Sequence, residues 1–222
     1  MYKILVTGSA GFIGFSISEA FLKRGATVYG LDNIDNYYSI KLKKKRIREL
    51  NKHKNFKFLN KDIADIKFLK KKISKIDFDY IFHFAAQPGV RYSLKNPKKY
   101  YNVNVIGYKN IIKDINKKKV KKIIYASSSS VYGDQKKFPT NEESILNAKN
   151  PYGVSKIFNE NLSSIYSNFY NLNFIGLRLF TVYGEWGRPD MFIFKLLNCI
   201  KKENFFYLNR AGNHKRDLTY IK

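Results

Sequence analysis

The chain has 222 residues, a mass of 26.0 kDa and 44% hydrophobic residues, which is enough apolar material for one large folded domain and argues against disorder. Its 42 Lys and Arg residues against 17 Asp and Glu give a formal charge of +25. One cysteine excludes an internal disulfide framework, and that cysteine with three scattered His residues predicts no metal site.

The positive charge lies in lysine runs, such as Lys43–Lys45 and Lys70–Lys72, in segments with helical spacing. Such runs are usually the solvated face of a helix, and neither a Cys/His finger nor an RNP-type aromatic motif accompanies them. We therefore expect no nucleic-acid partner.

The apolar stretch at residues 4–22 is broken by glycines and carries Glu19, and no uninterrupted apolar run approaches the ~18 residues of a membrane span. We predict no membrane partner and a cytoplasmic protein.

Short apolar runs of strand length alternate along the chain with longer stretches of helical spacing. The first such stretch places Ile13, Ile17 and Phe21 on one helix face. Alternation of buried strands with helices predicts a parallel sheet covered on both faces. We therefore expect an α/β fold, a Rossmann-type doubly wound sheet over residues 1–180. The predicted strands are residues 4–6, 28–31, 56–59, 80–84, 123–126 and 174–177.

The pattern changes after residue 180. Residues 181–190 are rich in Gly, Pro and charge and predict a loop, and residues 191–200 predict a helix. Residues 219–222 resemble the start of another element, without a polar tail. We therefore expect residues 181–222 to begin a substrate-binding region that is truncated here.

Three glycines, Gly8, Gly11 and Gly14, lie between the first predicted strand and helix. Such a turn lets the backbone approach a pyrophosphate at a helix N-terminus, although a plain structural turn is the alternative.

Asp32 follows the second strand, 18 positions after Gly14. A carboxylate there accepts hydrogen bonds from ribose hydroxyls and repels a 2′-phosphate, unless it is an ordinary turn aspartate. The pattern favours NAD over NADP.

Tyr152 and Lys156 lie four positions apart, behind a helix start predicted by Asn150 as cap and Pro151 in the first turn. A lysine ammonium and a cationic nicotinamide both favour a tyrosinate that can act as a base. A Tyr-x-x-x-Lys pair also arises by chance, so the pair alone does not establish a catalytic site.

A run of serines, residues 127–130, follows the fifth predicted strand. Ligands bind at this end of an open parallel sheet, where serine hydroxyls can contact a substrate, although serine runs are often plain loops. The run has no Gly-x-Ser-x-Gly elbow, which disfavours a serine hydrolase.

Together these motifs resemble the extended short-chain dehydrogenase/reductase family over essentially the whole chain. The stretches that carry the resemblance are TGSAGFIG (residues 7–14), Asp32, Asp62 with Ile63, HFAAQPGVRYS (83–93), the serine run ending at residue 133, PYGVSK (151–156) and LRLFTVYGEWGRPDM (177–191). Within the family, HFAAQPGVRYS (83–93) and FTVYGEWGRPDM (180–191) are similar to nucleotide-sugar 4-epimerases that act on UDP-glucuronate.

The resemblance implies a role for each matched position. The implied catalytic residues are Ser128, Tyr152 and Lys156. The implied substrate-binding residues are Ser128, Ser129, Thr181 and Arg188. The implied NAD-binding residues are Gly8, Gly11, Phe12, Ile13, Gly14, Asp32, Asn33, Asp62, Ile63, Ala85, Ala86, Gln87, Asn104, Ser127, Tyr152, Lys156 and Phe180.

The implied activity is NAD-dependent 4-epimerisation of a UDP-sugar, UDP-glucuronate to UDP-galacturonate, through a 4-keto intermediate. Tyr152 would take the 4-hydroxyl proton, Lys156 would lower the pKa of Tyr152, and Arg188 would meet an anionic group of the substrate. Arg188 could instead pair with Glu185 or Asp190. A related nucleotide-sugar dehydratase or decarboxylase and a catalytically incompetent nucleotide-binding fragment stay open as alternatives, as does a homodimer.

Overall fold

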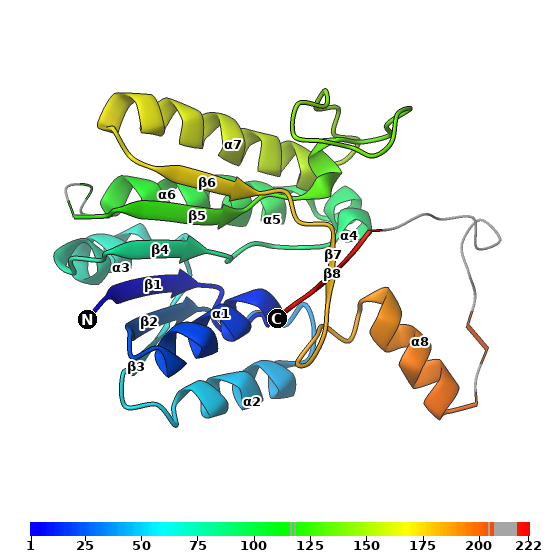
Figure 1. The fold of residues 1–222 in the computed structure, drawn as a ribbon, viewed down its shortest axis with the longest axis horizontal. Coiled ribbons are helices and arrows are strands. Elements are labelled where there is room, and N and C mark those ends of the chain that lie inside the picture. Colours follow the sequence, from blue (N-terminus) through cyan, green and yellow to red (C-terminus); the bar gives the residue numbers. More distant parts are fainter. Residues whose placement is uncertain (116, 118, 204, 207–216) are drawn as a thin grey trace.

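A six-stranded parallel sheet forms the centre of the molecule (Figure 1), in the strand order β3-β2-β1-β4-β5-β6. The computed structural model describes residues 1–115, 117, 119–203, 205–206 and 217–222. Each strand predicted over residues 1–180 is found, which confirms the Rossmann-type class. The strands are β1 (Lys3–Thr7), β2 (Thr27–Asp32), β3 (Phe56–Asn60), β4 (Tyr80–His83), β5 (Lys122–Ala126) and β6 (Phe174–Leu177).

Helices cover both faces of this sheet. Alternate residues of β1 enter different cores: Ile4 packs with residues of α1 and α2, whereas Leu5 packs with residues of α3 and α6. This is why the strand reads as a continuous apolar run. The helices are α1 (Phe12–Lys23), α2 (Ile40–Leu50), α3 (Ile66–Lys72), α4 (Val90–Lys95), α5 (Pro97–Tyr100), a π-helical segment (Tyr101–Gly107), α6 (Tyr108–Asp114) and α7 (Pro151–Tyr170), with 3₁₀ turns at Ile73–Lys75 and Ser129–Val131.

The strand order reverses between β1 and β4, because the chain builds β2 and β3 on one side of β1 and then continues on the other side. Open parallel sheets bind their ligands in the crevice at the carboxyl ends of the strands that flank such a reversal. The topology therefore places a binding crevice beyond Thr7 and His83, where these two strands end.

The lysine runs behave differently from one another. Lys70, Lys71 and Lys72 at the end of α3 are exposed, as predicted. In α2, Lys44 and Lys45 are exposed, but Lys43 is only 6% exposed. The expectation that the whole run at 43–45 is solvated is therefore wrong for Lys43, because that helix position faces the crevice.

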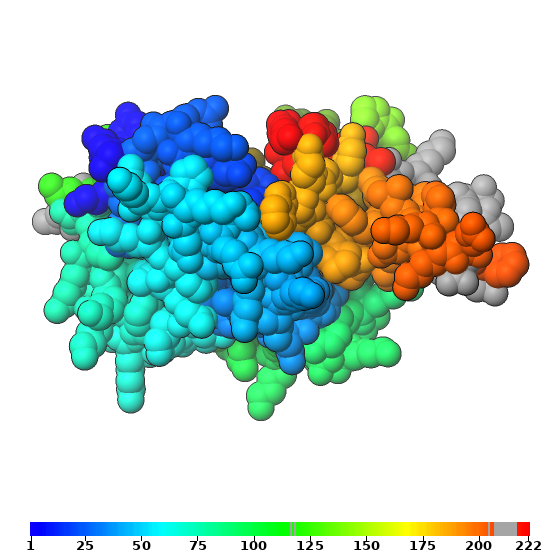
Figure 2. All heavy atoms as spheres, turned by 90° about the horizontal axis from the view of Figure 1, so that it is seen from below, coloured from blue at the N-terminus to red at the C-terminus, as the bar shows by residue number. Residues whose placement is uncertain are grey.

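Residues 181–190 contain an unpredicted strand. β7 (Thr181–Tyr183) pairs in parallel with β8 (Leu218–Tyr220), forming a separate two-stranded sheet. The loop prediction was wrong for β7 because its pairing partner is remote in the chain. The predicted helix at 191–200 is found as α8 (Phe192–Lys201). The segment after β7 lies against α2, as the space-filling view shows (Figure 2).

Among the described residues, no helix combines the length and the apolar character that crossing a membrane requires.

Candidate active site

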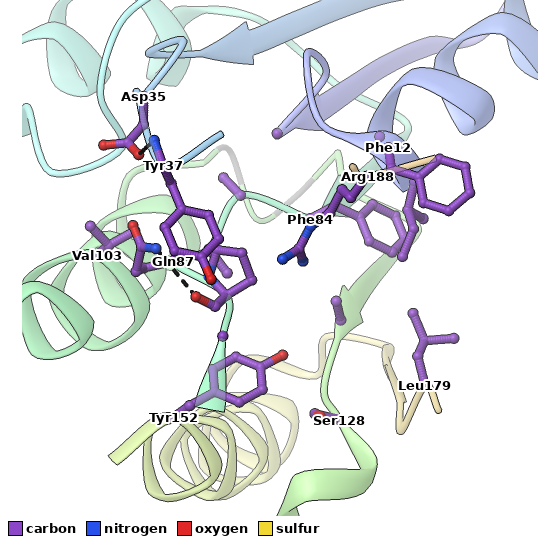
Figure 3. A pocket seen from close by; sticks show the side chains of 18 of the residues that line it. Phe12, Asp35, Tyr37, Phe84, Gln87, Val103, Ser128, Tyr152, Leu179 and Arg188 are labelled. Atoms are coloured by element: carbon purple, nitrogen blue, oxygen red, sulfur yellow. Dashed lines mark hydrogen bonds between the residues drawn. The ribbon is translucent and has the colours of Figure 1, made fainter. Parts of the chain in front are cut away.

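A cleft of about 450 Å³ opens at the carboxyl ends of β1, β4 and β5 (Figure 3). Most residues implied by the sequence line it, although they come from elements far apart in the chain. The implied residues that line the cleft are Gly8, Phe12, Ile13, Gly14, Asp32, Asn33, Asp62, Ile63, Ala85, Ala86, Gln87, Ser127, Ser128, Ser129, Tyr152, Lys156, Phe180, Thr181 and Arg188. Gly11 and Asn104 are not among the lining residues.

The glycine-rich turn packs directly on the end of β4. Gly8 has φ +75°, and a Cβ there would lie 2.6 Å from the backbone nitrogen of Ala85, so only glycine fits. A Cβ on Gly14 would lie 2.1 Å from the carbonyl oxygen of Gly8. Gly11 is the N-cap residue of α1, and its N–H donates to the Gly8 carbonyl at 2.9 Å. Its contribution is to close the turn.

The first turn of α1 faces the cleft through Phe12, Ile13 and Gly14. The first N–H groups of a helix lack intrahelical acceptors, and no side chain caps this helix. These donors and the positive end of the helix dipole suit an anionic group such as a pyrophosphate.

Asp32 holds the glycine-rich turn from the end of β2. Its Oδ2 accepts the N–H of Ala10 at 3.0 Å, and its Oδ1 accepts the N–H of Ile34 at 2.7 Å. Burial raises the pKa of Asp32, although these hydrogen bonds and the nearby Lys43 oppose the rise. Each carboxylate oxygen accepts more than one hydrogen bond, so Asp32 can hold the turn and still accept from a ribose hydroxyl.

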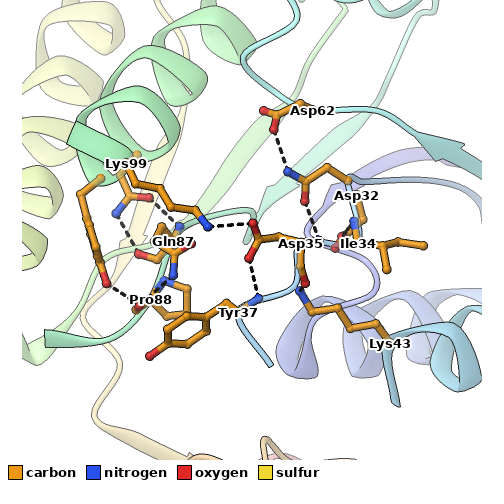
Figure 4. A network of polar contacts seen from close by, with 12 residues as sticks. Asp32, Ile34, Asp35, Tyr37, Lys43, Asp62, Gln87, Pro88 and Lys99 are labelled. Atoms are coloured by element: carbon orange, nitrogen blue, oxygen red, sulfur yellow. Dashed lines mark hydrogen bonds and ion pairs between the residues drawn. The ribbon is translucent and has the colours of Figure 1, made fainter. Parts of the chain in front are cut away.

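A polar network continues from Asp32 around the same end of the cleft (Figure 4). Asn33 Nδ2 donates to Asp62 Oδ2 at 2.7 Å, which connects the ends of β2 and β3. Lys99 Nζ donates to Asp35 Oδ2 at 2.8 Å, and Lys43 Nζ donates to the Asp35 carbonyl at 2.6 Å. Asp35, Lys43 and Lys99 line the cleft but belong to no motif, so the sequence offered no signal for them.

Asn104, one of the implied NAD-binding residues, lies behind the cleft wall and is not among the lining residues. It lies in the π-helical segment, is 1% exposed, and its Oδ1 accepts the N–H of Gln87 at 2.7 Å. Its Nδ2 donates to the Gln87 carbonyl at 3.1 Å and to Ser155 Oγ at 3.0 Å. Asn104 thereby joins the Gln87 wall to α7, beside Lys156.

Tyr152 and Ser128 lie close to each other at the floor of the cleft (Figure 3), and Lys156 lines the same cleft. Helix α7 begins as predicted, because Asn150 Oδ1 accepts the N–H of Gly153 at 2.9 Å and Pro151 occupies the first turn. Tyr152 and Ser128 both line the cleft, and the Ser128 hydroxyl is close enough to influence the pKa of the Tyr152 phenol. Lys156 Nζ donates to the carbonyl of Ala126 at 2.7 Å, and the residue is 1% exposed.

The electrostatics of this trio differ from the expectation that Lys156 lowers the pKa of Tyr152. Burial raises the pKa of Tyr152, and the Ser128 hydroxyl and the charge of Arg188 oppose this rise. Lys156 Nζ lies 5.8 Å from the Tyr152 ring centroid, and burial lowers the pKa of Lys156 to about 8. Arg188 is thus a cation that favours tyrosinate in this structure.

Arg188 lines the cleft and also pairs with Asp190, the alternative left open by the sequence. Its Nε donates to Asp190 Oδ1 at 3.0 Å, and its guanidinium lies 5.7 Å from the Tyr37 ring centroid and 5.8 Å from that of Tyr38. Glu185, the other candidate partner, instead pairs with Lys222 at 2.8 Å. Asp190 therefore aims a guanidinium that still faces the cleft.

Below the serine run lies an ion pair that no motif indicated. Ser127 Oγ donates to Glu160 on α7, and Arg178 Nε donates to the same carboxylate at 3.0 Å. Ser128 Oγ accepts the N–H of Ser130 at 3.1 Å. These contacts fix the serine run between β5 and α7, so Ser128 is held in place beside Tyr152. Within the described part of the chain, no cluster of His, Cys, Asp and Glu could hold a metal ion.

Comparisons with known proteins agree with this geometry. The model of the NAD dependent epimerase/dehydratase family matches residues 4–222. UDP-glucuronate 4-epimerase of Thermodesulfobacterium geofontis is 40% identical over 218 residues, which are 98% of this chain and 67% of that protein. UDP-glucuronate 4-epimerase 4 of Arabidopsis thaliana is 39% identical over 98% of this chain and 51% of its own length. The chain thus spans about half to two thirds of the length of these relatives.

A solved structure is similar over the same region. The UDP-glucuronic acid 4-epimerase of Bacillus cereus, in complex with UDP-glucuronic acid and NAD, superposes with a TM-score of 0.92 at 35% identity. The match covers 99% of this chain and 69% of the Bacillus chain. From the fold, the cleft and these matches together, the chain belongs to the NAD-dependent epimerase/dehydratase family.

Proposed function

We propose that this protein catalyses the NAD-dependent 4-epimerisation of a UDP-sugar, converting UDP-glucuronate to UDP-galacturonate through a 4-keto intermediate. The observation that carries the proposal is that Tyr152, Ser128 and Lys156 line the same cleft as the glycine-rich turn. The similarity to UDP-glucuronate 4-epimerases supports the choice of substrate.

The residues present fit a dinucleotide. The close approach of Gly8 to β4, the free N–H groups at the start of α1 and the Asp32 carboxylate match a pyrophosphate followed by a ribose. Asn33, Asp62 and Ile63 line the cleft next to Asp32, where an adenine would follow. When bound, NAD supplies a reversible acceptor for the hydride of the substrate C4.

Tyr152 is the proposed base. Its phenolate takes the proton of the 4-hydroxyl as C4 is oxidised, and the resulting phenol returns that proton after the 4-keto sugar has presented its other face. Ser128 donates to the sugar 4-oxygen and keeps the phenol aligned, because its own loop is fixed by Glu160. The reaction is redox-neutral, since the hydride that leaves C4 returns to it.

Lys156 and Arg188 supply the electrostatics. Lys156 is held by the Ala126 carbonyl and lies on the cleft floor, where an ammonium can hold the hydroxyls of a nicotinamide ribose. Arg188 opposes the burial that raises the Tyr152 pKa, and its guanidinium fits either anion of the substrate, the diphosphate or the C5 carboxylate.

The test is direct assay of the purified protein with UDP-glucuronate and NAD, with the products followed by proton NMR. We expect UDP-galacturonate to form without net reduction of NAD. UDP-glucose and UDP-N-acetylglucosamine serve as neutral-sugar controls. A dehydrated sugar would instead identify a dehydratase, and release of CO₂ would identify a decarboxylase. NAD binding without turnover of any of these sugars would identify a binding fragment.

A further inference from the structure

Arg46 of α2 is completely buried and reaches two loops that are far apart in the sequence. Its Nη1 donates to the carbonyl of Ala10 at 2.8 Å and to the hydroxyl of Tyr38 at 2.7 Å. Its Nη2 donates to the carbonyl of Trp186 and, at 3.3 Å, to that of Gly187. A single guanidinium thus joins the glycine-rich turn to the segment that carries Arg188.

The contacts of Arg46 continue in both directions. Ala10, whose carbonyl accepts from Arg46, donates its own N–H to Asp32 Oδ2 at 3.0 Å. On the other side, Gly187 directly precedes Arg188. The Tyr38 ring lies between the two arginines, with its centroid 5.6 Å from the Arg46 guanidinium and 5.8 Å from that of Arg188. A continuous chain of polar contacts therefore runs from Asp32 to Arg188.

The Trp186 ring anchors the same segment from the apolar side. It packs on Phe15 of α1 with 5.2 Å between the ring centroids. The segment is thus fastened to the cofactor side of the molecule twice, once through an aromatic contact and once through Arg46.

A purely structural role for Arg46 explains these contacts poorly. Burying a charge costs free energy, and the cost is offset best by a carboxylate. Within the described part of the chain Arg46 makes no ion pair, and its Nε has no hydrogen-bond partner. An apolar side chain would avoid this cost, but only a planar fork with two separate Nη groups can hold both loops at once.

We propose that Arg46 is a positioning residue that couples the cofactor site to the substrate site. NAD bound against the glycine-rich turn fixes the position of Ala10. Through its hydrogen bonds to Ala10 and Gly187, Arg46 then fixes the position of Gly187 and thus of Arg188. UDP-glucuronate therefore binds more tightly when NAD is present, and by thermodynamic reciprocity NAD binds more tightly when UDP-glucuronate is present. This inference rests on the proposed function.

The experiment measures the coupling itself. In a Tyr152→Phe parent, which binds ligands without turning them over, the Kd of UDP-glucuronate is measured by calorimetry without NAD and with saturating NAD. We expect NAD to tighten binding in the parent by about 10-fold, within the usual range of coupling between two sites. Adding Arg46→Met should bring the two values within about 2-fold of each other, a near-complete loss of coupling. The Kd of NAD alone should change little, because Asp32 and α1 are untouched.

Two further variants isolate the role of the guanidinium. Arg48→Met removes an exposed arginine from the same helix and should leave the coupling intact. Arg46→Lys keeps the charge, but one ammonium cannot hold both loops, so its coupling should be lost as in Arg46→Met. Circular dichroism and thermal unfolding of each variant report whether the fold is kept.

Several results would overturn the inference alone. The first is that the Tyr152→Phe parent binds the two ligands independently. The second is that the Arg46 variants keep the coupling. The third is that the Arg46 variants lose UDP-glucuronate affinity equally with and without NAD. Misfolding of both Arg46 variants beside a folded Arg48→Met would assign Arg46 to folding only. A parent that binds NAD but no UDP-sugar would contradict the proposed function as well.

Discussion

Lys156 offers a quantitative test of the electrostatics of the cleft, because its burial has opposite consequences for stability and for activity. The residue is 1% exposed, and burial lowers its pKa from 10.5 to about 8. One pKa unit corresponds to 1.36 kcal/mol, so keeping this ammonium charged in the folded protein costs about 3 kcal/mol. Lys156→Met keeps the length of the side chain and removes that cost. It also removes the hydrogen bond to the Ala126 carbonyl, a loss of about 1–3 kcal/mol if the carbonyl stays unpaired.

The sign of the pH dependence follows from proton linkage. Between pH 8 and pH 10.5 the unfolded chain binds more protons at Lys156 than the folded protein does, so wild-type stability rises with pH across this window. The Met variant lacks this contribution. We therefore expect wild type to gain about 2–3 kcal/mol of unfolding free energy relative to Lys156→Met between pH 7 and pH 10.

Urea denaturation of the NAD-free protein at pH 7, 8, 9 and 10 measures this difference, with Lys44→Met as a matched control at an exposed lysine. Epimerase activity of Lys156→Met should fall steeply at every pH, because the lysine that we propose to hold the nicotinamide ribose is gone. A stability difference between wild type and Lys156→Met that stays constant from pH 7 to pH 10 would refute the argument that burial lowers the pKa of Lys156.

Three further predictions concern the reaction. Tyr152→Phe removes the proposed base and should lower epimerisation by about 10²-fold or more while NAD binding changes little; near wild-type turnover would exclude Tyr152 as the base. Fluorescence titration should show NAD preferred over NADP, because Asp32 repels a 2′-phosphate, and equal affinities would contradict that role. Arg188→Ala should weaken use of UDP-glucuronate by roughly 10–100-fold, the range expected for losing a charged hydrogen bond. Steady-state comparison with UDP-glucose locates Arg188: a loss confined to glucuronate places it at the carboxylate, an equal loss places it at the diphosphate, and no loss removes it from the site.

Local patterns were sufficient to predict the strands of the main sheet and the helix start at Pro151. The strands of the main sheet were predicted because a strand buried on both faces reads as a short apolar run, which depends on few neighbouring residues. The start of α7 was predicted because Asn150 and Pro151 act within one helical turn. Most of the cleft lining followed from motifs for a similar reason, since each motif is local and lies at the carboxyl end of a strand or, for Tyr152 and Lys156, at the start of α7.

The tertiary structure decided whatever depends on contacts between remote segments. β7 was predicted as a loop because its partner, β8, lies after α8. Asn104 was expected in the cleft lining, but its carboxamide meets Gln87 and Ser155, which no spacing along the chain relates to it. Arg46 carries no motif at all, and only the packing of α2 against two loops gives its guanidinium four acceptors. A side chain whose partners are far away in sequence leaves no local pattern, because its environment is created only when the chain has folded.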